Sequence, residues 1–160
     1  MIGGAPARTP ANTIIYAVGD VHGRLDLLDL LHERIVEDAR DHARDRRKVV
    51  VYLGDFVDRG LNSAGVIDRL IEQPLNGFEA FHLIGNHDAW LLGFLEDVSI
   101  GPSWLRHGGD ATLLSYGISP LVQLNDFEAL EAVQQRLRSR MPDAHLDFLE
   151  SLELCLEFGD

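Results

Sequence analysis

The sequence predicts an α/β fold in which three parallel strands alternate with helices. Three short runs rich in β-branched and aromatic residues, at positions 13–18, 48–53 and 78–84, predict the strands. The first two runs are unbroken, which is typical of strands that are buried on both faces. Because helical patterns separate the three runs, parallel pairing within one sheet is favoured.

The first three elements follow directly from their residues. Thr13–Val18 reads TIIYAV and ends at Gly19, where the first strand should stop. From Arg24 to about Ala43, apolar residues recur at helical spacing and charged residues occupy the other face, which predicts an amphipathic helix. Residues 48–53 read KVVVYL and predict the second strand.

Capping and breaking residues mark the elements that follow. Ser63 can cap a helix that runs through Ile71 and that Pro74 terminates, and the third strand follows it. The remainder of the chain is predicted to be mainly helical. Helices are expected at 88–95, 108–116, 126–138 and 143–152, and a fourth strand is expected at 154–158.

The composition is that of one globular domain. The chain has 160 residues, of which 46% are hydrophobic and 25% are charged, so it can bury a core. No repeat or linker divides residues 1–160, and residues 1–12 are expected to be a flexible leader. Cys155 is the only cysteine, which excludes an intrachain disulfide. The sequence shows neither a signal-peptide pattern nor a long apolar run, so we expect a cytoplasmic protein.

The charge balance argues against two classes of partner. Fourteen basic residues face 26 acidic residues, which gives a formal net charge of −12. Such a surface repels phosphate backbones and anionic lipids. We therefore expect no nucleic-acid partner and no membrane partner.

Each of the three predicted strands is followed by a glycine and then by a residue whose side chain carries an oxygen atom. The pairs are Gly19-Asp20, Gly54-Asp55 and Gly85-Asn86. The carboxyl ends of parallel strands lie at one edge of the sheet, where such folds bind ligands. His22, Asp58 and His87 follow these pairs at short offsets. Oxygen and imidazole ligands together suit Mn, Fe, Zn or Mg, so the pattern predicts a metal site.

The residue sequences of these motifs resemble the signatures of the phosphoprotein-phosphatase family of serine/threonine phosphatases. The three signatures are GDVHG at 19–23, GDFVDRG at 54–60 and GNHD at 85–88. The segment WLRHGGDATLLSYG at 104–117 is similar to the bacterial members of the family. The resemblance covers residues 13–117 well. It implies a metallophosphoesterase sandwich with an α/β/α architecture.

The resemblance also implies a ligand set for two divalent metal ions, with Mn expected and Fe, Zn or Mg as alternatives. Asp20 and His22 would bind the first metal, and Asp55 would bridge both metals. Asn86 would bind the second metal through its amide oxygen. A water shared by the two metals would then attack phosphorus in line.

Three further residues receive catalytic roles from the same resemblance. Arg59 would clamp the phosphate oxygens and offset charge in the transition state. His87 would protonate the leaving alkoxide, and Asp58 would orient the His87 ring and stabilise the imidazolium. The other histidines, at positions 32, 42, 82, 107 and 145, match no ligand of the family and are expected to be surface or packing residues.

The pattern breaks at the end of the chain. In the family, a strand like that at 154–158 leads into a His-Ala-Gly segment that binds the second metal, but this chain ends at Asp160. We therefore expect an N-terminal fragment of the sandwich: its βαβαβ portion and a helical segment, with the C-terminal half absent. Such a fragment should bind at most one metal well. Its exposed sheet could also support a dimer.

The main functional expectation is metal-dependent hydrolysis of phosphomonoesters, with phosphoserine or phosphothreonine proteins or a small phosphomonoester as substrate. One alternative is a diadenosine-polyphosphate hydrolase of the same superfamily. The complete Asp58-Arg59-Gly60 ending argues mildly for the protein phosphatase. A second alternative is a truncated, non-catalytic binding module that retains the fold.

Overall fold

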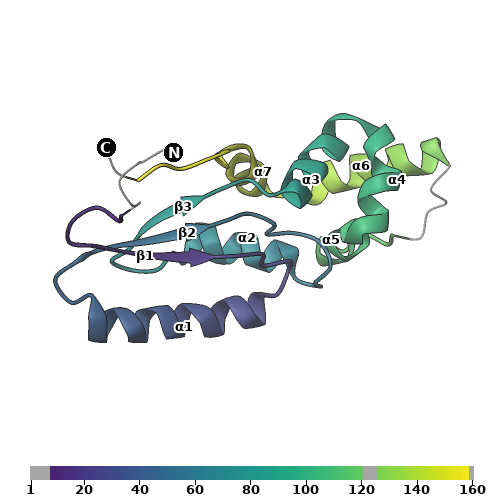
Figure 1. The fold of residues 1–160 in the computed structure, drawn as a ribbon. Coiled ribbons are helices and arrows are strands. Elements are labelled where there is room, and N and C mark those ends of the chain that lie inside the picture. The colour runs from purple at the N-terminus through teal and green to yellow at the C-terminus, as the bar shows by residue number, and fades with distance from the viewer. Residues whose placement is uncertain (1–7, 121–125, 159–160) are drawn as a thin grey trace, which may run out of the picture.

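The protein contains a three-stranded parallel sheet with the strand order β1-β2-β3, in a computed structural model that describes residues 8–120 and 126–158 (Figure 1). The strands are β1 (Thr13–Val18), β2 (Arg47–Tyr52) and β3 (Glu79–His82). Ile15 is the register partner of Val49, which pairs in turn with Glu79. The predicted α/β fold with parallel pairing is confirmed.

Two helices connect the strands and pack against each other. They are α1 (Leu25–His42) and α2 (Ser63–Glu72). Figure 1 shows α1 lying along the sheet. The buried Tyr52 hydroxyl of β2 lies 2.7 Å from Nε2 of His32 on α1, so this histidine is a packing residue as expected. The cap of α2 differs from the prediction: Asn62 is the N-cap, and its side-chain oxygen accepts from the backbone N–H of Gly65 at 3.2 Å.

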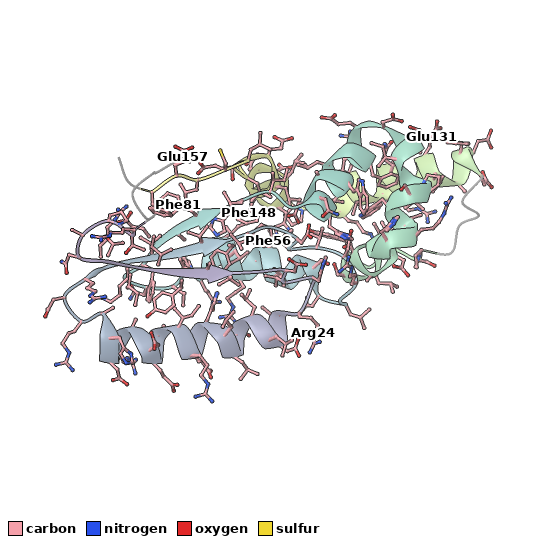
Figure 2. The ribbon with its side chains drawn as sticks, viewed as in Figure 1. Arg24, Phe56, Phe81, Glu131, Phe148 and Glu157 are labelled. Atoms are coloured by element: carbon pink, nitrogen blue, oxygen red, sulfur yellow. The ribbon has the colours of Figure 1, made fainter. Side chains whose placement is uncertain are left out.

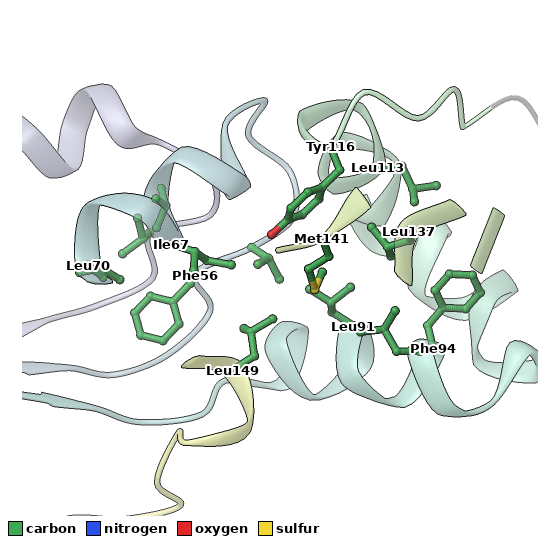
Figure 3. Close-up of a cluster of buried hydrophobic side chains, with 14 of the residues drawn as sticks. Phe56, Ile67, Leu70, Leu91, Phe94, Leu113, Tyr116, Leu137, Met141 and Leu149 are labelled. Carbon is green, nitrogen blue, oxygen red and sulfur yellow. The ribbon is translucent and has the colours of Figure 1, made fainter. Parts of the chain in front are cut away.

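The second half of the chain forms a helical cluster beyond the carboxyl ends of the strands (Figure 1). Its elements are α3 (Asn86–Glu96), the 3₁₀ turn η1 (Val98–Ile100), α4 (Gly101–Trp104), the π-helical turn η2 (Leu105–Gly109), α5 (Asp110–Ser115), α6 (Phe127–Arg140) and α7 (Asp143–Glu150). Large apolar side chains fill the space between these helices, as Figure 3 shows. Phe94, Leu113 and Leu137 are among the fully buried ones.

The two halves of the fold meet at Phe56, which lies in the second signature. Its ring is fully buried and packs edge-on against Phe148 of α7, with centroids 5.6 Å apart (Figure 2). Phe148 also contacts His82 at the end of β3, with a centroid separation of 5.1 Å. Phe56 therefore anchors the loop after β2 in the apolar core.

Two strand predictions need correction. The strand expected at 154–158 does not form: Glu153 makes a single bridge to Leu83, and Leu154 is 88% exposed. A strand buried on both faces needs a covering layer, and the described residues provide none over Leu154. β1 is only partly buried, with Ala17 exposed, because β1 is an edge strand with a single neighbour. β2 lies in the centre, and its Val49 and Val50 are fully buried, as predicted.

Two expectations concern the ends of the chain and its environment. The leader expected at residues 1–12 lies mostly outside the described residues. Within residues 8–120 and 126–158, no helix has both the length and the hydropathy that a membrane crossing requires.

Candidate metal centre

The three signature loops touch through their glycines. A side chain at Gly23, whose φ is +62°, would bring its Cβ to 2.5 Å from the Gly60 carbonyl oxygen. A Cβ at Gly85 would overlap the carboxylate and the backbone nitrogen of Asp55. The first loop thus meets the second, and the second meets the third, because glycine allows this close approach.

Backbone hydrogen bonds hold the first two loops in register. The N–H groups of Val21 and His22 both donate to the Asp55 carbonyl, at 3.1 and 2.8 Å. The Gly23 N–H donates to the Phe56 carbonyl at 2.9 Å. These bonds extend the β1–β2 pairing past the ends of the strands and fix His22 beside Asp55.

The side chain of Asp88 links the second and third loops. Its buried carboxylate accepts hydrogen bonds from the backbone N–H groups of Asp55, Phe56 and Gly85, at 2.8, 2.9 and 3.0 Å. Burial raises the pKa of Asp88 to about 6, although the three N–H donors oppose this rise. Asp88 lies in the third signature, but no role was predicted for it from the sequence. The available signal was an acidic residue at the third helical position, which often caps a helix start.

Backbone strain concentrates in these loops. Five described residues other than glycine have a positive φ, and four of them belong to the first two signatures. They are His22 (45°), Asp55 (54°), Asp58 (72°) and Arg59 (65°). Such conformations persist where the surrounding structure enforces them, and they cluster at functional sites.

His22, Asp55 and His87 each offer a ligand atom to one small volume. These atoms lie within 4.8 Å of one another, an arrangement that can hold a metal ion. Nδ1 of His22 lies 2.8 Å from the Val57 carbonyl, to which only a protonated nitrogen can donate. Nε2 is then the unprotonated nitrogen of the neutral ring, and it is buried without a hydrogen-bond partner among the described residues. An imidazole oriented in this way fits a divalent cation.

The other two predicted ligands lie at the same edge of the sheet. Asp20 follows β1, its side chain is exposed, and its Oδ2 is 3.6 Å from Nε2 of His22. Asn86 is the first residue of α3, directly before His87, and it is also exposed. The structure therefore brings His22, Asp55 and His87 together and places Asp20 beside His22.

His87 and Asp58 form a buried pair next to this cluster. Nδ1 of His87 lies 2.8 Å from Oδ2 of Asp58, whose side chain is completely buried. Trp104 donates its indole N–H to the same carboxylate at 3.0 Å, and the Thr112 hydroxyl donates at 2.7 Å. Burial raises the pKa of Asp58, while these hydrogen bonds lower it by less. Trp104 and Thr112 were not predicted as site residues, because they lie far from Asp58 in the sequence and contact it only in the folded protein.

Arg59 borders the cluster. The Nη2 atom of its guanidinium lies 3.0 Å from Nε2 of His87. Because a guanidinium can only donate, this His87 nitrogen is an acceptor, and the ring proton is on Nδ1, facing Asp58. The Arg59 backbone N–H donates to the Gly108 carbonyl at 3.0 Å, which attaches the second signature to the π-helical turn.

The parallel sheet and its helices agree with the α/β fold of a metallophosphoesterase domain. Residues 14–153 match the sequence model of the family described as calcineurin-like phosphoesterase, and the chain belongs to this family.

Curated relatives refine the comparison. The chain is 30% identical over 134 residues to a symmetrical bis(5'-nucleosyl)-tetraphosphatase of Acidovorax ebreus, a match that covers 66% of this chain and 44% of the relative. It is 32% identical over 103 residues to the asymmetrical bis(5'-nucleosyl)-tetraphosphatase PrpE of Oceanobacillus iheyensis, with 62% of this chain and 39% of the relative covered. A symmetrical enzyme of Dechloromonas aromatica is 43% identical over 77 residues, which are 48% of this chain and 25% of the relative. The chain thus spans less than half the length of each of these relatives. They support the broad family and are not protein phosphatases by name.

Proposed function

We propose that the protein is a metal-dependent hydrolase that acts on bis(5'-nucleosyl) tetraphosphates. The observation that carries this proposal is the convergence of His22, Asp55 and His87 beside Arg59. Such a centre can bind and cleave a phosphate ester or anhydride. The relatives named for tetraphosphate hydrolysis favour the dinucleotide over a phosphoprotein.

The cation ligands would come from all three loops. Asp20, His22 and Asp55 would hold a first ion, and Asp55 and Asn86 would contribute to a second. When bound, divalent cations polarise the phosphoryl oxygen and lower the pKa of water, which supplies the nucleophile. With three protein ligands against two, the first position should bind more tightly in this chain, because affinity rises with ligand number and charge. Mn, Fe, Zn and Mg all suit such ligands.

His87 would donate a proton to the leaving group. Its Nδ1–H already faces Asp58, so a second proton would sit on Nε2 and point into the cluster. The buried Asp58 carboxylate would stabilise the resulting positive charge and keep the ring in place. Trp104 and Thr112 would hold Asp58 in turn.

Arg59 would bind the phosphate that is attacked. In the arrangement described here, its guanidinium faces His87 Nε2, which is the position that the extra proton would occupy. Two positive groups would repel each other there, so Arg59 would turn towards the phosphate oxygens as His87 gains its proton. A planar guanidinium can contact two of these oxygens at once.

A protein serine/threonine phosphatase is the second candidate. The observation that favours it is the complete GDFVDRG signature at 54–60, which is shared with that family by resemblance.

A competition between substrates tests the proposal. The chain would be assayed with Mn²⁺ on bis(5'-adenosyl) tetraphosphate, a phosphoserine peptide and 4-nitrophenyl phosphate. We expect kcat/KM to be at least about tenfold higher for the tetraphosphate than for the peptide, which corresponds to about 1.4 kcal/mol of preference. The opposite preference would promote the protein phosphatase. Metal binding without turnover of any substrate would favour the alternative of a non-catalytic binding module.

A further inference from the structure

A row of four aromatic rings leads from the metal centre to the surface. The His22 and His87 rings have centroids 4.7 Å apart, and His87 and Trp90 are separated by 5.1 Å. Trp90 in turn contacts His107, with centroids 4.7 Å apart and the planes tilted by 40°. Trp90 is partly buried and His107 is exposed. The outer two rings have no role in the chemistry proposed above.

The outer rings are held in place by the elements that build the centre. Trp90 lies on α3, almost one turn after His87, so both rings come from the same end of one helix. The His107 ring is oriented by a 2.8 Å hydrogen bond between its Nδ1 and the Ser103 carbonyl. The next residue, Gly108, has a φ of 109° and accepts the backbone hydrogen bond of Arg59. The backbone beside His107 is therefore fixed to the backbone of Arg59, the proposed phosphate-binding residue.

We propose that Trp90 and His107 form a stacking surface for a base of the nucleotide substrate, an inference that rests on the proposed function. Every nucleobase has a π-face, and aromatic side chains that bind bases use stacking of this kind. Arg59 contacts His87 on one side of the row, while His107 lies at its exposed end. A phosphate at Arg59 and a base at His107 would be two ends of one nucleotide. The surface would thus select nucleoside phosphates over phosphoserine, which has no aromatic group.

Exposure distinguishes this ring pair from ordinary core packing. The other tryptophan, Trp104, is completely buried, stacks on Phe94 at 4.9 Å and donates its N–H to Asp58. Trp90 also packs against the core, but it is only partly buried, and it contacts the exposed His107, beside which a further ring can join the row.

Tryptophan fluorescence measures the proposed contact without turnover. The chain has two tryptophans, and since Trp104 is buried, a base that stacks on the surface should quench Trp90. The probes are AMP and ribose 5-phosphate, which carry the same phosphate and differ in the base. With Mn²⁺ present, we expect AMP to quench the emission and to bind more tightly, and ribose 5-phosphate to leave it nearly unchanged. Equal quenching and equal affinity for the two probes would overturn the proposal.

Variants of the exposed ring test the surface further. His107→Ala should weaken AMP binding roughly tenfold, the order of a single base–aromatic stack, and leave ribose 5-phosphate binding unchanged. His107→Phe keeps a ring and should retain the AMP affinity. His42→Ala, at another exposed histidine, is the matched control and should have no effect. Wild-type AMP affinity in the His107→Ala variant would contradict the stacking surface.

Hydrolysis separates this inference from the function on which it rests. His107→Ala should lower kcat/KM roughly tenfold for bis(5'-adenosyl) tetraphosphate, but not for a phosphoserine peptide that contains no aromatic residue. If the wild-type chain cleaves the tetraphosphate while AMP and ribose 5-phosphate bind alike, the stacking surface is wrong and the function stands. If AMP alone quenches and the tetraphosphate is not cleaved, the function is wrong and the surface stands.

Discussion

The two halves of the candidate centre are built in different ways. The half that would bind cations, at Asp20, His22 and Asp55, is held by backbone hydrogen bonds and close glycine contacts, and its side chains are partly open. The half that would move a proton, at His87 and Asp58, is buried and held by side chains. Nε2 of His22 is free of hydrogen-bond partners among the described residues, and the Asp55 carboxylate accepts from the His87 backbone N–H at 2.9 Å. The Asp58 carboxylate, by contrast, is held by the Trp104, Thr112 and His87 side chains, because a carboxylate that orients a histidine must itself be fixed.

The largest expected effect tests this division of labour. His87→Asn removes the proposed proton donor and should lower turnover of a phosphoserine peptide by about 10²–10⁴, the usual contribution of a general acid, because a serine alkoxide needs a proton to leave. The loss should be smaller for the tetraphosphate and for 4-nitrophenyl phosphate, whose nucleotide and phenolate leave as stable anions. Assays at rising Mn²⁺ concentration provide the control. If excess Mn²⁺ restores the rate, His87 is a cation ligand and the division is wrong.

A second prediction concerns the stability of the sheet that carries the centre. Burial lowers the pKa of His82 to about 4 from an ordinary value of 6.5, and its ring stacks on Tyr52 at 5.0 Å. The folded state then binds fewer protons than the unfolded state between these values. Its stability is retained above pH 6.5 and falls as the pH drops towards 4, by at most about 3 kcal/mol.

Urea unfolding between pH 4 and pH 7 measures this effect. His82→Phe, which keeps the ring stack but cannot titrate, should flatten the dependence on pH. An unchanged slope in that variant would assign the acid sensitivity to other groups.

The smallest expected effect concerns the support of the buried half. Thr112→Val keeps the shape of the side chain but removes the hydroxyl that donates to Asp58 at 2.7 Å. Unfolding should become easier by about 1–3 kcal/mol, the cost of an unsatisfied buried polar group. Thr13→Val is the control, because that hydroxyl makes only a 3.3 Å bond to the Ala11 carbonyl. Equal losses at both positions would show that the Asp58 network adds nothing specific.

The same contrast explains what the sequence could predict. The cation-binding half could be predicted because its residues lie in short motifs directly after predicted strands, as with His22 and Asp55. The supports of the buried half were not visible, because Trp104 and Thr112 reach Asp58 across 46 and 54 residues of chain. No local spacing encodes such contacts.

Local patterns also misled in two places. The run at 154–158 has the composition of a strand, but the single bridge beside it joins Glu153 to Leu83, and the run itself does not pair. Ser63 has the composition of a helix cap, yet it is buried, and its hydroxyl accepts from the Asp58 backbone N–H at 3.2 Å while the adjacent Asn62 caps α2. In both cases tertiary contacts decided between options that the local sequence left open.

Anomalous diffraction from crystals grown with Mn²⁺ would show whether His22 and Asp55 bind a cation together. We predict a Mn²⁺ peak within about 2.3 Å of Nε2 of His22 and of the Asp55 carboxylate, the length of a metal–ligand bond. His22→Ala crystals grown in the same way should lose or weaken that peak. Full occupancy of Mn²⁺ elsewhere on the protein, with none between His22 and Asp55, would contradict the account.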